Sequence, residues 1–443
     1  MNAIFLAIVL LAVGVGAYRQ IVWVPQTPDA VAPMAALTSA VVDSAGGAVT
    51  LAIGLIGMMA LFLGLMKVAE AGGLLTIVAK TVRPLMVRAF PDVPPNHPAM
   101  GAMILNISAN ALGLGNAATP FGIRAMQALD TLNPHKGTAS NAMVLFLAIN
   151  TSSVTVLPTG VIALRASAGS ADPAGILATT LFATAMSTTV AFIATKLYQR
   201  WSASPQEMPV AAPAITPPEG APATPAPQPE SEAPDIPTET AEGAYPTWVS
   251  AVALACILGL IPLGVAYGRE IGPWVIPGLM VLFLAFGALR GVHVYEVLVD
   301  GARDGFQVAI RIIPYLVAIL VAVGMFRASG ALDILVGVLG PVTSLVGLPA
   351  EALPMALLRP LSGQGAYGVL ASIINDPAIG PDSYTGYLVS TIQGSTETTF
   401  YVLAVYFGAV QIRRSRHALP AALSADVAGV AGAIIACSYL YGG

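Results

Sequence analysis

The sequence predicts an all-α, polytopic integral membrane protein with two repeats that contain broken helices or helical hairpins, on three observations. The 443-residue chain is 56% hydrophobic and only 9% charged, whereas soluble domains contain about 25% charged residues. Its apolar runs are close to the ~20 residues that a helix needs to cross the ~30 Å hydrocarbon core of a bilayer. Finally, motifs in residues 1–201 recur in the same order in residues 247–443. A large soluble enzyme would need a charged exterior that this composition does not supply.

Long apolar runs are the candidate membrane helices. They are Met1–Tyr18, Val49–Met66, Pro173–Tyr198, Thr247–Tyr267, Pro273–Leu289, Gln307–Phe326 and Ala418–Tyr441. Backbone groups inside a bilayer have no water to bind, so spanning segments are helices or closed barrels. Runs this continuous are helical, because barrel strands alternate over ~10 residues. The first run lacks a basic segment before it, so we expect a retained helix there and no signal peptide. Counting hairpins that enter and return, we expect roughly eight to ten membrane segments.

Residues 202–246 are expected to link two membrane domains, 1–201 and 247–443. The stretch is rich in Pro, Ala and Glu and buries too little apolar surface to offset the entropy lost on ordering. Between Trp201 and Pro246 it holds seven acidic residues and no Lys or Arg, so removing it changes the net charge from −4 to +3. We therefore expect no nucleic-acid partner. A docking peptide for a partner protein is the alternative role of this stretch.

Three motifs occur in the same order in both halves, which indicates a duplication. The first opens a long apolar helix, the second is a small polar stretch preceded by a proline, and the third is a polar interruption of an apolar run. The pairs are Val42–Gly46 with Val299–Arg303, Ser108–Asn110 with Ser362–Gln364, and Asn150–Thr155 with Gln393–Thr398.

In the first half, polar and flexible residues interrupt an apolar helix that begins at Met100–Leu105. The interrupting residues are Asn106, Ser108, Asn110, Gly113, Gly115 and Asn116. Proline fits the first turn of a helix, so Pro120 favours a new helix from Phe121. We therefore predict a helical hairpin with a broken tip, followed by a second interruption at Asn150 and Ser152. Non-helical backbone persists at membrane depth only where protein buries it or where it lines a water-filled cavity.

The second half contains charged residues at the corresponding places. Arg359 precedes Ser362 and Gln364, and Glu397 lies within the interruption Gln393–Thr398. A carboxylate in the middle of an apolar helix costs ~2.5 kcal/mol or more unless it is paired or hydrated. We therefore predict an ion pair between Arg359 and Glu397 that lines a polar site.

These interruptions supply the candidate substrate- or ion-binding residues. They are Asn106, Ser108, Asn110, Asn150, Ser152, Arg359, Ser362, Gln364, Gln393, Ser395, Thr396 and Glu397. For the serines and threonines, helix packing through interhelical hydrogen bonds is the alternative role. The four histidines lie near loops and form no ligand set, so we expect no metal site and no cofactor. The sequence shows no Ser/His/Asp set, phosphate-binding loop or CxxC motif, so we expect no enzyme activity.

Two stretches resemble known families. Asn106–Pro134, NISANALGLGNAATPFGIRAMQALDTLNP, resembles the signature of the spore maturation protein A family. Gly394–Gly408, GSTETTFYVLAVYFG, is similar to the corresponding stretch of the spore maturation protein B family, as is Arg359–Gly365. The resemblance implies an A–B fusion joined by the linker, with two membrane domains of the gate, or nucleoside-recognition, type in a bacterial cytoplasmic membrane. It specifies no substrate.

Two hypotheses of function follow. The first is a transporter or permease-like protein for a small polar solute or ion, with Glu397 as a proton or cation site. Coupling to protons or sodium ions is compatible with it, and it predicts a polar cavity lined by both halves. The second is a membrane scaffold or regulatory complex without transport, which predicts a packed interface and oligomerisation. The lipid bilayer is the expected partner, and a homo-oligomer is compatible with either hypothesis.

Overall fold

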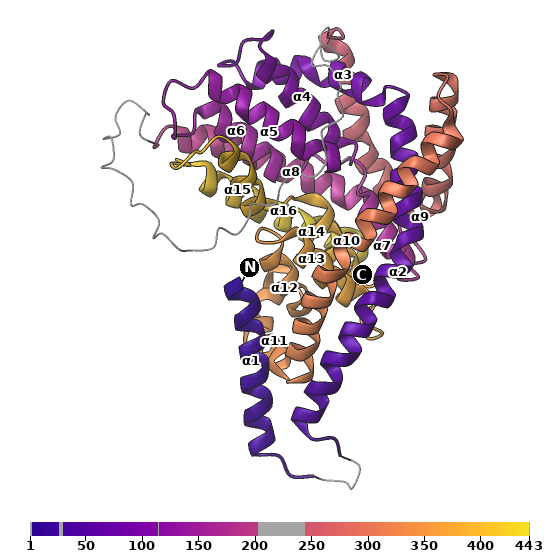
Figure 1. Ribbon diagram of the computed structural model, residues 1–443, viewed down its shortest axis with the longest axis vertical. Helices are drawn as coiled ribbons and strands as arrows, with labels where there is room; N and C mark the ends of the chain where they lie inside the picture. Colours follow the sequence, from indigo (N-terminus) through magenta and orange to yellow (C-terminus); the bar gives the residue numbers. More distant parts are fainter. Residues whose placement is uncertain (1, 26–29, 114, 203–243, 443) are drawn as a thin grey trace.

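The computed structural model describes residues 2–25, 30–113, 115–202 and 244–442, which fold into helices and confirm the all-α prediction (Figure 1). The first half contains α1 (Asn2–Ile21), α2 (Pro33–Ala71), α3 (Leu74–Ala89), α4 (Pro98–Ala111), α5 (Gly115–Thr131), α6 (Asn141–Thr151), α7 (Thr159–Ser167) and α8 (Ile176–Gln199). The second contains α9 (Thr247–Leu289), α10 (Val294–Ala328), α11 (Ala331–Thr343), α12 (Leu353–Leu358), α13 (Gly363–Ile374), α14 (Tyr384–Ser395), α15 (Thr399–Ala409) and α16 (Ala418–Tyr441). Short 3-10 turns at Ser344–Val346 and Ala350–Ala352 join α11 to α12. Except for its end residues, the predicted linker lies outside the described residues.

The predicted repeat is visible in the order of the helices. In each half a long helix and a shorter one (α2–α3 and α10–α11) precede a hairpin (α4–α5 and α12–α13). A helix broken in the middle follows (α6–α7 and α14–α15), and a long closing helix ends the half (α8 and α16). The sequence motifs therefore correspond to structurally equivalent elements.

Fewer helices are able to span a membrane than the sequence suggested. Among the described residues, four are long and apolar enough: α2, α8, Thr247–Gly264 within α9, and α16. A fifth candidate joins the end of α10 to α11 across a 72° bend. The expectation of eight to ten segments also counted hairpins that enter and return, which are shorter than a full span. The polar interruptions divide much of the apolar chain into such short helices. The helices α4–α7 and α12–α15 have between 6 and 17 residues.

The predicted runs Thr247–Tyr267 and Pro273–Leu289 both lie in α9, which is kinked where Tyr267 has non-helical backbone angles (φ −129°, ψ 15°). One local prediction differs from the structure. The predicted hairpin is present as α4–α5, but α5 begins at Gly115 and holds Pro120 inside it, instead of beginning at Phe121. The reason is that Gly113, at φ 75°, reverses the chain at once after α4. A positive φ is accessible to glycine at little cost.

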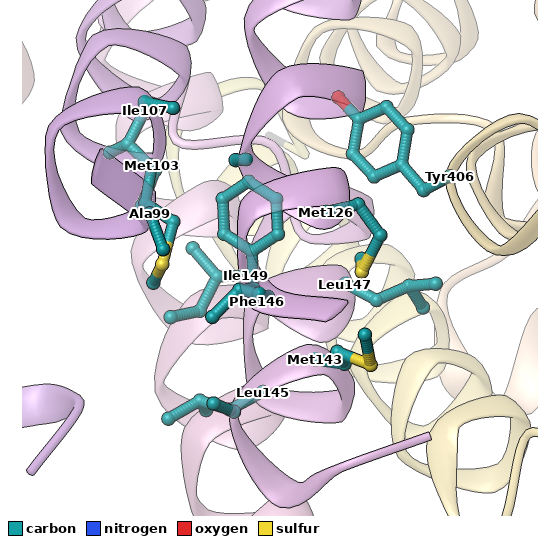
Figure 2. Close-up of a cluster of buried hydrophobic side chains, with 14 of the residues drawn as sticks. Ala99, Met103, Ile107, Met126, Met143, Leu145, Phe146, Leu147, Ile149 and Tyr406 are labelled. Carbon is teal, nitrogen blue, oxygen red and sulfur yellow. The ribbon is translucent and has the colours of Figure 1, made fainter. Parts of the chain in front are cut away.

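Each half contributes residues to the hydrophobic core of the other half. The first core consists largely of first-half residues, with Val402, Tyr406 and Phe407 of α15 and two alanines of α16. The second core consists largely of second-half residues, with Val161–Leu164 of α7 and residues of α2 and α8. Figure 1 shows α15 beside α5 and α6, and Figure 2 shows Tyr406 reaching into the first core beside Met126. The chain therefore exchanges α7 and α15, the second part of each broken helix, between the halves.

A fully buried arginine anchors α7 in the second core. Arg165 donates hydrogen bonds to the Pro381 carbonyl oxygen (2.6 Å) and to Asp382 Oδ1 (3.0 Å). Its guanidinium also lies 4.2 Å from the ring centre of Tyr387, an arrangement that attracts a cation to an aromatic face. These contacts join the end of α7 to the second half.

Helices α2 and α10 cross at small residues. A Cβ atom on Gly301 would lie 2.6 Å from Lys67 Cβ and 2.9 Å from Gly64 Cα, and one on Gly305 would lie 2.6 Å from Ala60 Cα. The pattern of small residues four positions apart on both helices allows such close backbone packing in membranes. Gly54 and Gly57, earlier on α2, have no atom within 4 Å of an added Cβ.

Replacing Gly301 with alanine should separate α2 from α10 and lower the free energy of unfolding by about 1–3 kcal/mol, the usual cost of overpacking. Thermal unfolding of the purified protein in detergent measures this. Gly57→Ala is the matched control on α2, since nothing lies within 4 Å of its added Cβ. We expect the control to unfold at the parent temperature or slightly above it. Equal unfolding temperatures for the two variants would contradict the close crossing.

The exchange of α7 and α15 predicts that the halves remain associated when the chain is cut within 203–243. A cut protein with an affinity tag on one half should retain the other half through purification in detergent, because each half completes the core of the other. Arg165→Ala should reduce the amount retained, and Arg83→Ala, outside both cores, should not. Recovery of a folded single half without its partner would show that the exchange is not needed for stability.

Candidate functional site

A pocket of about 290 Å³ lies where the broken helices of the two halves meet. Its lining comes from both halves and is mostly polar or small. The lining residues are Asn110, Gly113, Ser153, Thr155, Leu157, Pro158, Thr159, Gly160, Val161, Arg359, Gly363, Gln364, Tyr367, Gln393, Gly394, Thr396 and Glu397. The pocket thus joins the α4–α5 and α12–α13 hairpins to both helix interruptions.

The two interruptions are hydrogen-bonded to each other. The helix α6–α7 is open between Thr151 and Thr159, and α14–α15 is open at Thr396–Thr398. The amide N–H of Glu397 donates to the carbonyl oxygen of Thr151 (2.8 Å), which closes the contact between the halves. An unpaired backbone group at membrane depth is costly, so this bond both satisfies freed groups and fixes the relative position of the breaks.

Each interruption is also tied to the hairpin of its own half in the same manner. Val156 N–H donates to the Ala111 carbonyl oxygen (3.1 Å), at the tip of α4–α5. Phe400 N–H donates to the Pro360 carbonyl oxygen (3.0 Å), between α12 and α13. The equivalent bonds show that the repeat extends to the geometry of the site.

Arg359 and Glu397 form the predicted ion pair, with Arg359 Nη2 and Glu397 Oε2 3.6 Å apart. Arg359 is 4% exposed and donates to Thr398 Oγ1 (3.2 Å) and to the Thr396 carbonyl oxygen. The Glu397 side chain, in contrast, is 46% exposed. The separation exceeds a hydrogen bond, so the pair is held by charge. Arg359 therefore holds the backbone between α14 and α15 in place, while the Glu397 carboxylate remains accessible from the pocket.

In the first half, a network of amides connects the hairpin to the broken helix. Asn110 Nδ2 and the hydroxyl of Tyr406 both donate to Asn150 Oδ1, at 3.0 and 3.3 Å. Asn106 Nδ2 donates to the same tyrosine oxygen (3.1 Å). The Tyr406 ring stacks on Phe146, with centroids 6.0 Å apart. The exchanged helix α15 thus contributes a side chain that orders the pocket wall of the first half.

The structure separates the predicted residues into groups. Asn110, Arg359, Gln364, Gln393, Thr396 and Glu397 line the pocket. Asn106 and Asn150 lie behind its wall in the amide network, and Ser362 Oγ accepts the Gly365 N–H (3.0 Å) at the start of α13. Ser152 and Ser395 bond to carbonyl oxygens of their own helices, and Ser108 Oγ is buried without a hydrogen-bond partner among the described residues. These last three positions fit the packing role.

Sequence reasoning missed several pocket residues. Tyr367 follows Gln364 by three positions on α13, so helical periodicity places both on one face. Its hydroxyl donates to the Gly160 carbonyl oxygen (3.0 Å) across the halves. Ser153 lies within the predicted interruption Asn150–Thr155, but its φ of 44° is one that no local sequence pattern predicts. Among the described residues, no three His, Cys, Asp or Glu side chains lie close enough to hold a metal ion.

Comparison with known proteins is consistent with this duplicated site. The Gate family, described as nucleoside recognition, matches residues 52–168 and 309–413, and each range runs from a long helix to the end of a broken one. Spore maturation protein B of Bacillus subtilis is 47% identical over 167 residues, which cover 38% of this chain and 93% of that protein. Spore maturation protein A of the same organism is 46% identical over 151 residues, which cover 34% of this chain and 77% of that protein.

More distant similarities were also found. Inner membrane protein YjiG of Escherichia coli K12 is 35% identical over 88 residues, 20% of this chain and 58% of that protein. A solved structure, described as CNTnw in an inward-facing substrate-bound state, is 14% identical with a TM-score of 0.44 and covers 98% of this chain and 90% of its own. The family matches and the two spore maturation relatives confirm the resemblance in the sequence: the chain belongs to the Gate, or nucleoside-recognition, family of membrane proteins, as a fusion of an A-type and a B-type spore maturation domain.

Proposed function

We propose that this chain is a transporter-like protein of the bacterial cytoplasmic membrane that binds a small polar solute between its two Gate domains. The observation that supports the proposal is the pocket itself, which both halves line at their broken helices. Discontinuous helices are a common way for transporters to present polar groups to a solute near the centre of the membrane. A scaffold without transport would instead favour a dry, fully packed contact at this place.

The chemistry of the lining favours a solute that donates hydrogen bonds. Glu397 supplies a half-exposed carboxylate. In its ionised form a carboxylate accepts hydrogen bonds and donates none. The amide side chains of Asn110, Gln364 and Gln393 supply further acceptors and donors. The cation beside them, Arg359, is buried and directed at the backbone of the break. Hydroxyl, amine or amide N–H groups on the solute therefore match the site better than an anionic group does.

The size of the pocket limits the solute. Its volume, about 290 Å³, lies at the lower end of ligand pockets, which are roughly 300–1,000 Å³. A solute of modest size fits, and a peptide or lipid does not. Nothing in the lining distinguishes a nucleoside from another small polar solute. Reaction chemistry is not part of the proposal, because the pocket lining contains no nucleophile paired with a base.

Replacing Glu397 with glutamine should weaken solute binding. Loss of one charge-assisted hydrogen bond costs about 1.5–3 kcal/mol, equivalent to roughly 10- to 100-fold in affinity. The measurement is the rise in unfolding temperature of the purified protein with a panel of nucleosides, amino acids and polyols. Glu351→Gln, an exposed carboxylate away from the pocket, is the control. Equal stabilisation of both variants by the same solute would remove Glu397 from the site, and no stabilisation of the parent by any polar solute would count against binding.

Cysteine accessibility tests whether the pocket holds water. In a Cys256→Ser background, Gln364→Cys should react with a water-soluble thiol reagent, because position 364 lines the pocket. Ser108→Cys and Ser395→Cys are buried controls and should react at least tenfold more slowly in the folded protein. The native Cys437 is buried and should remain unmodified. Equal labelling rates at positions 364 and 108 would indicate that the pocket is closed to water.

A further inference from the structure

Helix α16 carries an acidic residue in the middle of a candidate membrane span. Asp426 is 4% exposed and lies within Ala418–Tyr441, a 24-residue apolar helix. Its Oδ2 accepts a hydrogen bond from Thr399 Oγ1 (2.7 Å). Its Oδ1 is buried without a hydrogen-bond partner among the described residues. Ionisable residues at such depth are rare and usually serve a function, yet nothing described above uses Asp426.

Asp426 lies directly behind the interruption that lines the pocket. Its partner Thr399 is the first residue of α15, immediately after the break. One turn along α16, Gly429 packs so closely on Thr396 that a Cβ atom would lie 2.5 Å from Thr396 Cγ2. On the neighbouring α8, Ser187 Oγ donates to the Ala425 carbonyl oxygen (2.8 Å). The break therefore has Glu397 on its pocket side and Asp426 on its inner side.

Arg359 is shared between these two acids. It lies 3.6 Å from Glu397 and donates to Thr398 Oγ1 (3.2 Å), next to Thr399, whose hydroxyl donates to Asp426. The charges of Arg359 and Asp426 attract each other. When both carboxylates are ionised the three groups carry a net charge of −1 in a poorly hydrated place. One proton on Asp426 makes the set neutral and removes the charge from an oxygen that no donor satisfies. Buried charges without compensation are costly.

The other titratable groups of the helices packed against α16 have partners of their own. On α8, Tyr198 contacts Ser424 and Lys196 lies over the ring of Phe192. On α14, Tyr384 contacts Ser438 and Tyr387 stacks on Tyr441 of α16. On α15, Tyr401 contacts Thr119 and Tyr406 contacts Asn106 and Asn150, while Cys437 of α16 contacts Thr391. Helix α6 contains no titratable side chain. Arg359, with Glu397 beyond it, is therefore the charged neighbour that acts on Asp426 in the described part of the chain.

We propose that Asp426 is a proton-binding site linked to the pocket through Arg359. This inference rests on the proposed function for the pocket. A solute that donates hydrogen bonds to Glu397 competes with Arg359 for that carboxylate. The charge of Arg359 then acts more fully on Asp426, so the O–H bond of the Asp426 carboxyl breaks, the electron pair remains on the carboxylate and the proton passes to solvent. Solute binding and proton release are coupled in this way, with no movement larger than a side chain required.

Infrared spectroscopy of the purified protein, titrated with acid and base in the absence of solute, tests the proton site by itself. The C=O band of a protonated carboxyl group should be present in the parent protein, absent in Asp426→Asn and present in Glu397→Gln. If Asp426→Asn does not fold, Thr399→Val provides the test, because loss of the donor to Oδ2 should move the titration midpoint to higher pH. Absence of any band that depends on Asp426 or Thr399 overturns the site. A band that responds to sodium ions at constant pH assigns the site to a metal ion and also overturns it.

The link through Arg359 is tested by the midpoints of the same titration. Glu397→Gln imitates a solute that occupies Glu397, so the Asp426 midpoint should fall by about one pH unit, equivalent to tenfold in proton affinity. Arg359→Met should raise it, and Glu351→Gln should leave it unchanged. Equal midpoints in all variants would show that Asp426 is not coupled to the pocket. A solute panel that fails to bind while these shifts are observed would overturn the proposed function and leave the proton site intact.

Discussion

The hydrogen bond from Glu397 N–H to the Thr151 carbonyl oxygen is the contact on which the rest of the arrangement depends. Breaking a helix inside a membrane frees backbone groups that lipid cannot satisfy. Here two breaks satisfy each other, and the hairpin of each half satisfies a further group through Val156 and Phe400. The pocket lies at this junction, where polar backbone from the broken helices of both halves converges.

The side chains at the junction divide into those that hold it and those that face the pocket. Arg359 donates hydrogen bonds to the Thr396 carbonyl oxygen and to Thr398 Oγ1, so its guanidinium stabilises the non-helical backbone of the break. Glu397, on the same segment, keeps its carboxylate accessible. Tyr406 belongs to the second half, but its hydroxyl donates to Asn150 of the first half and so helps to order the pocket wall there. Residues of both halves are therefore needed to order the site.

The sequence was informative where composition and local pattern determine structure. The helical membrane class, the repeat, the α4–α5 hairpin and the Arg359–Glu397 pair all follow from apolar runs and from polar residues that interrupt them. Which apolar runs form a full span could not be predicted, because a run that is divided by a polar break has the composition of a spanning helix but not its length. Tyr406 and Arg165 were also missed, since their roles depend on which half each helix packs against. That choice is made by tertiary contacts far apart in sequence, which a single sequence does not display.

The exchange of α7 and α15 constrains the order in which the protein assembles. During synthesis the first half emerges with α7 finished, but most of the core that buries Val161–Leu164 comes from residues after position 347. Domains that form as the chain is made generally complete their cores one after another. Here α7 packs on α2 of its own half, but its burial is completed only when the second half is present. Because both halves belong to a single polypeptide, they are made in equal number and remain close to each other.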